Sequence, residues 1–273
     1  MASFDFDQAE GLRRMVAGPK PRVFTILSAT SGEEKAAMLV NLGASLARSG
    51  SDVLLVDACM ETQGIASRMD MVRGATLLQV ARQERALDEA IQPMSQGFGV
   101  VTVSRGPRAG ADDPQEQRRV ETAFSALAVR ADILIVDAEL DRQDAFALPS
   151  VAEGEIVVQV ANNPQSITAA YSLIKRLNGR LGRRPFGILV TGTSDKEAQQ
   201  VFRNMALAAN RYLAVKLHSL GSVPADDHLK RAAHLGRSVI DAFPLANASV
   251  AFRQLAGRFA LPGMPVQRAN LGI

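Results

Sequence analysis

Cysteine, tryptophan and long apolar runs are what this 273-residue sequence lacks. Its single cysteine, Cys59, excludes an intramolecular disulfide and fits a reducing compartment. The absence of tryptophan and an aromatic content of 5% argue against a surface that stacks single-stranded nucleic acid. No stretch approaches the roughly 18 apolar residues of a membrane-spanning helix, and the acidic start of the chain has no apolar core of a signal peptide. We therefore expect a cytoplasmic protein.

An excess of one charge is also missing. The chain has 31 Lys and Arg residues against 28 Asp and Glu residues, so its net charge is only +3. These charges are spread along the chain, as expected for a solvated surface of mixed charge, and we predict no nucleic-acid partner. The three histidines are scattered in the sequence, so it predicts no metal site.

Short apolar runs alternate with helical patterns along most of the chain. Several runs are rich in Val, Ile and Leu without polar alternation, which is typical of strands covered on both faces. The runs begin at Val23, Val53, Val100, Ile133, Glu155, Gly187 and Leu217. Helices are predicted over residues 33–48, 115–130, 166–181 and 196–212. This alternation predicts an α/β fold with a doubly wound, mostly parallel sheet flanked by helices.

The two ends of the chain fall outside this alternation. Residues 4–17 have the pattern of a short helix that Asp5 can cap, and the Gly-Pro-Lys-Pro segment at 18–21 ends that helix as a stiff spacer. Prolines and glycines in the last residues argue against a regular element there. We therefore predict three parts: an N-terminal partner-binding helix and linker at 1–21, an α/β domain at 22–260, and an irregular tail at 261–273.

The first strand leads into a turn and a helix, which is where an α/β protein holds phosphate on free N–H groups. A working phosphate loop reads Gly-x-x-x-x-Gly-Lys-Ser/Thr. Lys35 keeps the lysine, but Glu34 stands at the second glycine and Ala36 stands at the hydroxyl that binds Mg²⁺. Glutamate adds negative charge beside an anion, and alanine cannot ligate the metal. Taken alone, the segment favours an ordinary strand–turn–helix capped by Thr30 or Ser31.

Two aspartates stand at the ends of later strands. Asp57 closes the run VLLVDA, and Asp137 closes the run ILIVDA. Because ligands of an open α/β sheet bind at the carboxyl ends of its strands, both carboxylates are expected where a Mg²⁺-nucleotide would lie. The alternative, in which each aspartate only caps a helix or begins a turn, stays open.

Together these motifs resemble the ParA/MinD family of P-loop ATPases, whose loop reads Lys-Gly-Gly-x-Gly-Lys-Ser/Thr. The resemblance implies a P-loop NTPase fold of the MinD/ParA type. It places Gly32, Lys35, Ala36 and Asp137 at the ATP and Mg²⁺ positions. It places Asp57 at the position that orients the attacking water.

The sequence departs from this family at the residues that handle nucleotide. Thr30 replaces the extra lysine that reaches the partner's nucleotide in the family's ATP-bound dimer, and Cys59 replaces the second aspartate of its Asp-Ala-Asp motif. The segment after the sixth strand, LVTGTS, lacks the asparagine that lies near the adenine. We therefore expect that hydrolysis is lost or strongly impaired and that ATP and Mg²⁺ binding is weak or absent.

Within the superfamily the sequence is similar to the FlhG/FleN family of regulators of flagellar number and placement. The segment DQAEGLRR matches the family's N-terminal motif, which binds and stimulates the signal-recognition-type GTPase FlhF. By this resemblance, the residues that bind the partner are Asp7, Gln8, Ala9, Leu12, Arg13 and Arg14. The stretches NNPQSITAAYSLIKRL, SDKEAQQVF and LGSVPADDHLKRAA add to the resemblance, which covers about residues 5–260.

The resemblance implies a regulator of flagellar biosynthesis that acts by protein–protein contacts. Its expected partners are an FlhF-like GTPase and flagellar switch or transcription-regulator proteins, with recruitment to the cell pole or inner membrane face. Phe252, Leu255 and Phe259 share one face of a final helix that could touch a bilayer, although we expect that face to pack on the core. Two other functions stay open: a working ATP switch that dimerises with ATP, and an accessory protein of polysaccharide secretion like BcsQ.

Overall fold

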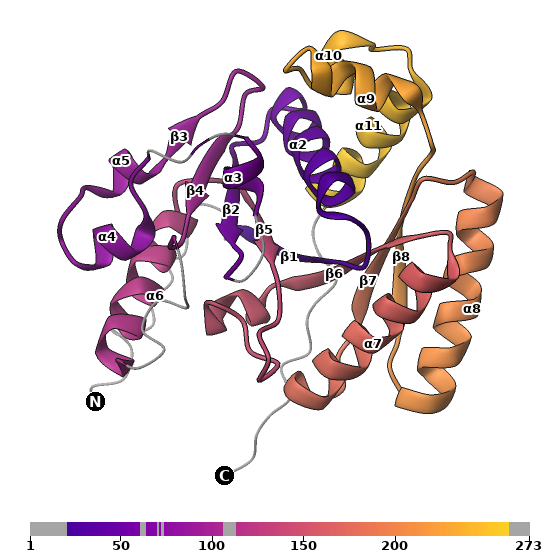
Figure 1. Ribbon diagram of the computed structural model, residues 1–273, viewed down its shortest axis with the longest axis horizontal. Helices are drawn as coiled ribbons and strands as arrows, with labels where there is room; N and C mark the ends of the chain where they lie inside the picture. The colour runs from indigo at the N-terminus through magenta and orange to yellow at the C-terminus, as the bar shows by residue number, and fades with distance from the viewer. Residues whose placement is uncertain (1–20, 61–63, 70, 72–73, 106–112, 262–273) are drawn as a thin grey trace, which may run out of the picture.

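Helices cover both faces of one eight-stranded sheet in the computed structural model of the chain (Figure 1). The structure describes residues 21–60, 64–69, 71, 74–105 and 113–261. The predicted helix at 4–17 and the tail at 262–273 lie outside the described residues. The strands are β1 (Arg22–Ser28), β2 (Val53–Ala58), β3 (Gln92–Pro93), β4 (Gly99–Thr102), β5 (Ile133–Ala138), β6 (Glu155–Ala161), β7 (Phe186–Thr191) and β8 (Leu217–Val223).

The strands lie in the order β3-β4-β2-β5-β1-β6-β7-β8. All neighbouring strands pair in parallel except β3 and β4, which are antiparallel. This arrangement confirms the predicted doubly wound, mostly parallel sheet. Every residue of β2 and of β5 is buried, as the runs without polar alternation predicted.

Four long helices follow the predicted ranges to within two residues at each end. They are α2 (Gly32–Arg48), α6 (Pro114–Ala128), α7 (Pro164–Leu181) and α8 (Asp195–Leu213). The shorter helices are α3 (Ile65–Arg68), α4 (Leu77–Ala81), α5 (Leu87–Ala90), the 3₁₀ turn η1 (Pro149–Glu153), α9 (Asp227–His234), α10 (Val239–Ala242) and α11 (Asn247–Ala260). The apolar pattern did not predict α3, α4, α5 or the two-residue β3, because elements this short contain too few residues to show a period.

Alternate residues of each strand point to opposite faces, and each face has its own apolar core. On β1, Phe24 and Ile26 join the core under α2, α9, α10 and α11. Leu27 joins the other core, which packs against α4, α6, α7 and α8. Figure 1 shows α2 and α11 side by side on one side of the sheet, with α7 and α8 on the other.

The apolar face of α11 belongs to the core. Phe252, Leu255 and Phe259 are 1%, 2% and 1% exposed, and the ring of Phe259 lies 4.4 Å from that of Phe24. The face considered for bilayer contact is therefore buried against the sheet. None of the described helices is both long enough and apolar enough to cross a membrane.

Candidate functional site

The polar groups at the start of α2 form hydrogen bonds with one another. Ser31 caps the helix: its Oγ accepts from the N–H of Glu34 at 3.2 Å, and the Glu34 carboxylate accepts from the N–H of Ser31 at 3.1 Å. This capping box lets α2 begin at Gly32, so residues 32–34 are already helical. The residue at the second-glycine position therefore closes a cap, with its negative charge where a bound phosphate would need positive charge.

Lys35 is committed to a buried ion pair. Its ammonium pairs with Asp137 and also donates to the carbonyl of Ala138 at 2.8 Å. The two side chains are only 13% and 4% exposed. Burial alone would lower the pKa of Lys35, but the charge and hydrogen bond of Asp137 together with Cys59 and Glu139 outweigh it and raise that pKa. Lys35 is therefore charged and held by the protein itself.

The two strand-end aspartates meet because β2 and β5 are neighbours. Asp57 and Asp137 are direct partners in the parallel register of these strands. Their carboxylates accept from the first N–H groups of α3: Asp137 from Ile65 at 2.7 Å, and Asp57 from Ala66 at 2.9 Å. In this structure the two aspartates cap α3.

Glycine at position 64 is required by this close approach. A Cβ atom there would collide with the carboxylate of Asp57. Gly64 directly precedes α3, so its missing side chain lets the helix start reach both carboxylates. This role could not be predicted from the sequence, because Gly64 belongs to none of the predicted motifs.

Burial dominates the electrostatics of this cluster. It raises the pKa of Asp57 to about 6, helped by the charge of Asp137 and opposed by the N–H groups of Cys59 and Ala66 and by Lys35. Burial and Asp137 also raise the pKa of the Cys59 thiol, so this cysteine is not an activated nucleophile. The thiol contacts the carbonyl oxygen of Asp137 at 3.7 Å.

Three of these side chains also lie at a spacing that a metal ion could bridge. One ligand atom each of Asp57, Cys59 and Asp137 falls within 4.8 Å of the others. The sequence predicted no metal site, and this grouping belongs to no ligand motif because it forms only when β2 and β5 pair. The ammonium of Lys35 already supplies positive charge to it.

The residues at the nucleotide positions do not fit a Mg²⁺-nucleotide. Ala36 has no hydroxyl for the metal, and its methyl group packs against the core beneath α2. The hydroxyl of Thr30 lies 2.9 Å from Ser28 Oγ within the turn. A Cβ on Gly32 would meet the guanidinium of Arg68, so that side chain lies against the start of α2. Of the predicted site residues, the structure brings Lys35, Asp57 and Asp137 together.

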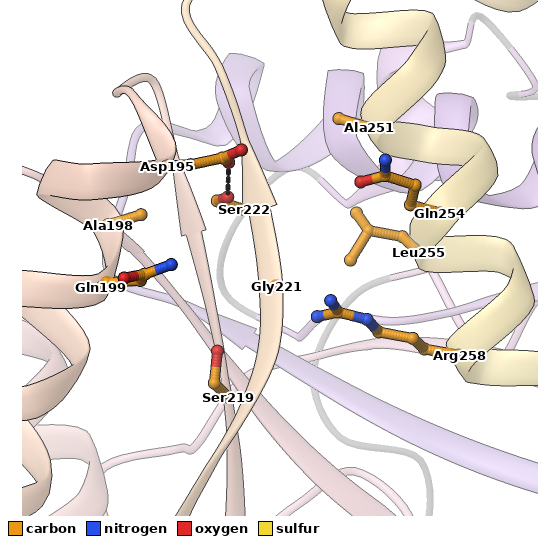
Figure 2. Close-up of a pocket in the computed structure, with 10 residues that line it drawn as sticks. All are labelled: Asp195, Ala198, Gln199, Ser219, Gly221, Ser222, Ala251, Gln254, Leu255 and Arg258. Atoms are coloured by element: carbon orange, nitrogen blue, oxygen red, sulfur yellow. Dashed lines mark hydrogen bonds between the residues drawn. The ribbon is translucent and has the colours of Figure 1, made fainter.

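The partner-binding residues predicted at positions 7–14 lie outside the described residues, and their role stays a prediction. A separate pocket between α8, β8 and α11 is shown in Figure 2. In it Asp195 accepts from Ser222 at 2.6 Å, and Arg258 donates to the carbonyl of Leu220 at 2.8 Å. None of the predicted site residues lines this pocket.

Comparison of sequences identifies two relatives. The chain is 28% identical to the antiactivator FleN of Pseudomonas aeruginosa over 249 residues, which is 89% of each protein. It is 26% identical to an uncharacterised ATP-binding protein of Methanocaldococcus jannaschii over 238 residues, which is 85% of each. A scan against protein-family models finds no match.

Comparison of structures supports the same fold. The cell-division protein MinD of Aquifex aeolicus matches with a TM-score of 0.65 at 19% identity, over 90% of this chain and all of MinD. A ParA-family ATPase of Chlorobium tepidum matches with a TM-score of 0.62 at 19% identity, over 86% of this chain and 97% of the other. MinD of Pyrococcus horikoshii, solved with Mg-ADP, matches with a TM-score of 0.62 at 18% identity, over 88% of this chain and 96% of the other. These similarities confirm the predicted fold of MinD/ParA type.

Proposed function

Because the chain is a FleN-like member of the ParA/MinD family, we propose that it regulates flagellar biosynthesis through protein–protein contacts, without ATP hydrolysis. The relative from Pseudomonas aeruginosa is named an antiactivator. A regulator of this kind needs surfaces for its targets. It does not need to hydrolyse ATP if its conformation is no longer controlled by bound nucleotide.

The buried ion pair between Lys35 and Asp137 is the observation that carries this proposal. A phosphate would have to draw the Lys35 ammonium away from this carboxylate and leave Asp137 buried without its counter-ion. Separating a buried ion pair costs about 3–5 kcal/mol, because the remaining charge is not solvated. The carboxylate of Glu34 would oppose the incoming anion as well.

The proposed partner surface is the N-terminal segment. Its motif Asp7-Gln8-Ala9 with Leu12, Arg13 and Arg14 is assigned to an FlhF-like GTPase by resemblance to the FlhG/FleN family. The body of the domain is assigned to flagellar switch or transcription-regulator proteins. The double variant Arg13→Glu/Arg14→Glu should lose stimulation of the GTPase while its urea midpoint stays unchanged. Full stimulation by this variant would contradict the assignment.

Calorimetry tests the loss of nucleotide function. The full-length chain should give no binding heat with millimolar Mg-ATP or Mg-ADP, and light scattering should give the same mass with and without Mg-ATP. Micromolar binding with measurable phosphate release would overturn the proposal. In that case Lys35→Ala shows whether binding uses this lysine, and Lys175→Ala is the matched control because Lys175 is an exposed lysine on α7.

A second candidate is a working ATP switch with an unusual loop. The convergence of Lys35, Asp57 and Asp137 at one edge of the sheet favours it. The two candidates make opposite predictions for ATP-dependent dimerisation, so the light-scattering experiment separates them. Neighbouring genes discriminate the BcsQ-like alternative, since a flagellar operon supports the proposal and a cellulose operon contradicts it.

A further inference from the structure

An exposed leucine on a loop that two arginines contact marks a surface that the nucleotide site does not use. Leu245 is 91% exposed in the loop that joins α10 to α11. Val250, on the first turn of α11, is 41% exposed. Figure 1 shows α9, α10 and α11 close together beside α2. We call this the Leu245 surface, and its members are Arg231, Phe243, Pro244, Leu245, Val250 and Arg253.

The two arginines are fixed beside the leucine by contacts with its own loop. The guanidinium carbon of Arg231, on α9, lies 4.8 Å from the ring centroid of Phe243. Arg253, on α11, donates to the carbonyl of Pro244 at 2.9 Å. Both arginines are exposed, and no carboxylate in the described part of the chain pairs with either of them. Two guanidinium groups without a carboxylate partner therefore contact the loop that carries Leu245.

Positive charge is concentrated in this part of the chain. From the start of α9 to the end of the described chain, residues 227–261 contain five Lys or Arg residues and two acids, Asp227 and Asp241, and Asp241 is paired with Arg48. The chain as a whole has a net charge of only +3. The surface around Leu245 is therefore complementary to a partner that carries negative charge.

Contacts of Asp226 and His228 hold the region around the loop that carries Leu245. Asp226 caps α9 through the N–H of His228 at 2.9 Å, and its other oxygen accepts from the N–H of Ala248, on α11, at 3.0 Å. The ring of His228 lies 4.6 Å from the ring of Phe243. These contacts fix the starts of α9 and α11 and the ring of Phe243 at the start of the loop. Binding at this loop would therefore cost little conformational freedom.

We infer that the Leu245 surface docks an acidic segment of a partner protein, with its carboxylates on Arg231 and Arg253 and an apolar pocket or side chain on Leu245. Planar guanidinium groups match carboxylates in a bidentate geometry. Arginine is enriched in protein interfaces and among the residues that carry most of their binding energy. The inference does not depend on the proposed function or on nucleotide.

Two other anionic partners fit less well. A bilayer interface requires a broad apolar face, but the face of α11 that carries Phe252, Leu255 and Phe259 is buried in the core. Nucleic-acid interfaces are more polar than protein–protein interfaces, and the side chain of Leu245 cannot donate a hydrogen bond to a phosphate. Both become outcomes of the experiment.

Photo-crosslinking from position 245 tests the inference in cells of the native host. The full-length chain carries p-benzoylphenylalanine in place of Leu245, and mass spectrometry identifies the crosslinked peptide. We expect an adduct with a protein segment rich in Asp or Glu, lost in Arg231→Glu/Arg253→Glu. Crosslinker at position 207 is the matched control, because Leu207 is 70% exposed on α8, away from this surface.

Affinity with the purified partner completes the test. Leu245→Ala and Arg231→Glu/Arg253→Glu should each weaken binding by about tenfold or more, while Leu207→Ala leaves it unchanged and all urea midpoints stay the same. The inference is overturned by the absence of a protein adduct, by a crosslinked segment without acids, or by an adduct that survives charge reversal. Leu245-dependent cosedimentation with phosphatidylglycerol vesicles, or Leu245-dependent binding to duplex DNA, overturns it too.

Discussion

Replacing Lys35 with methionine should destabilise the fold strongly. The substitution keeps the apolar stem of the side chain and removes the charge that pairs with Asp137, which is 4% exposed. Asp57 adds a second carboxylate to the same buried cluster. Removing one partner of a buried ion pair costs about 3–5 kcal/mol, and we expect a loss of this size in the free energy of unfolding at neutral pH.

Urea denaturation followed by far-ultraviolet circular dichroism measures this loss. Because the cost comes from uncompensated negative charge, it should shrink as the pH is lowered and carboxylates take up protons. Adding Asp137→Asn to Lys35→Met should recover much of the stability, and the double-mutant cycle gives the coupling between the two residues. Lys175→Met, at an exposed lysine of α7, is the control and should change stability by about 0.5 kcal/mol or less.

An unchanged midpoint in Lys35→Met at neutral pH would refute the reasoning. It would mean that the Lys35 ammonium is free in solution and available to a phosphate. The ATP-switch alternative would then gain support, since its lysine must be able to leave Asp137. The same variant therefore connects the stability of the domain with its proposed lack of nucleotide function.

Three further predictions use the same denaturation assay. Burial raises the pKa of Asp57 to about 6, so the folded state binds a proton more tightly than the unfolded state and stability falls as the pH rises from about 4 to 6. Asp57→Asn should remove this loss of up to about 3 kcal/mol. An equal slope of stability against pH in both proteins would contradict the prediction. Gly64→Ala should cost about 1–3 kcal/mol because its Cβ displaces the Asp57 carboxylate, whereas Gly179→Ala, in open space on α7, should be neutral or stabilising. Phe259→Ala should cost about 3–5 kcal/mol by opening a cavity beside Phe24, and a loss below about 1 kcal/mol would argue that α11 is not docked on the sheet.

The long elements of this fold could be predicted because their signals are local. The strands that end at Ala58 and Ala138 are continuous apolar runs, and they are strands in the structure. The sequence left Thr30 or Ser31 as the cap of α2, and the structure decides for Ser31, which forms a capping box with Glu34. Helix α3 was not predicted, because four residues show no period and its start is stabilised by carboxylates from two other strands.

The sequence by itself determined which groups are present: a lysine kept at its position, a glutamate and an alanine where a phosphate loop needs glycine and a hydroxyl, and two aspartates at strand ends. Only the tertiary structure decided what those groups do. Lys35 and Asp137 are 102 positions apart, and they meet because β5 pairs with β1, whose end leads into α2. The sequence states which residue stands at each position. Whether two residues form an ion pair depends on strand register and burial, which are set by the packing of the whole sheet.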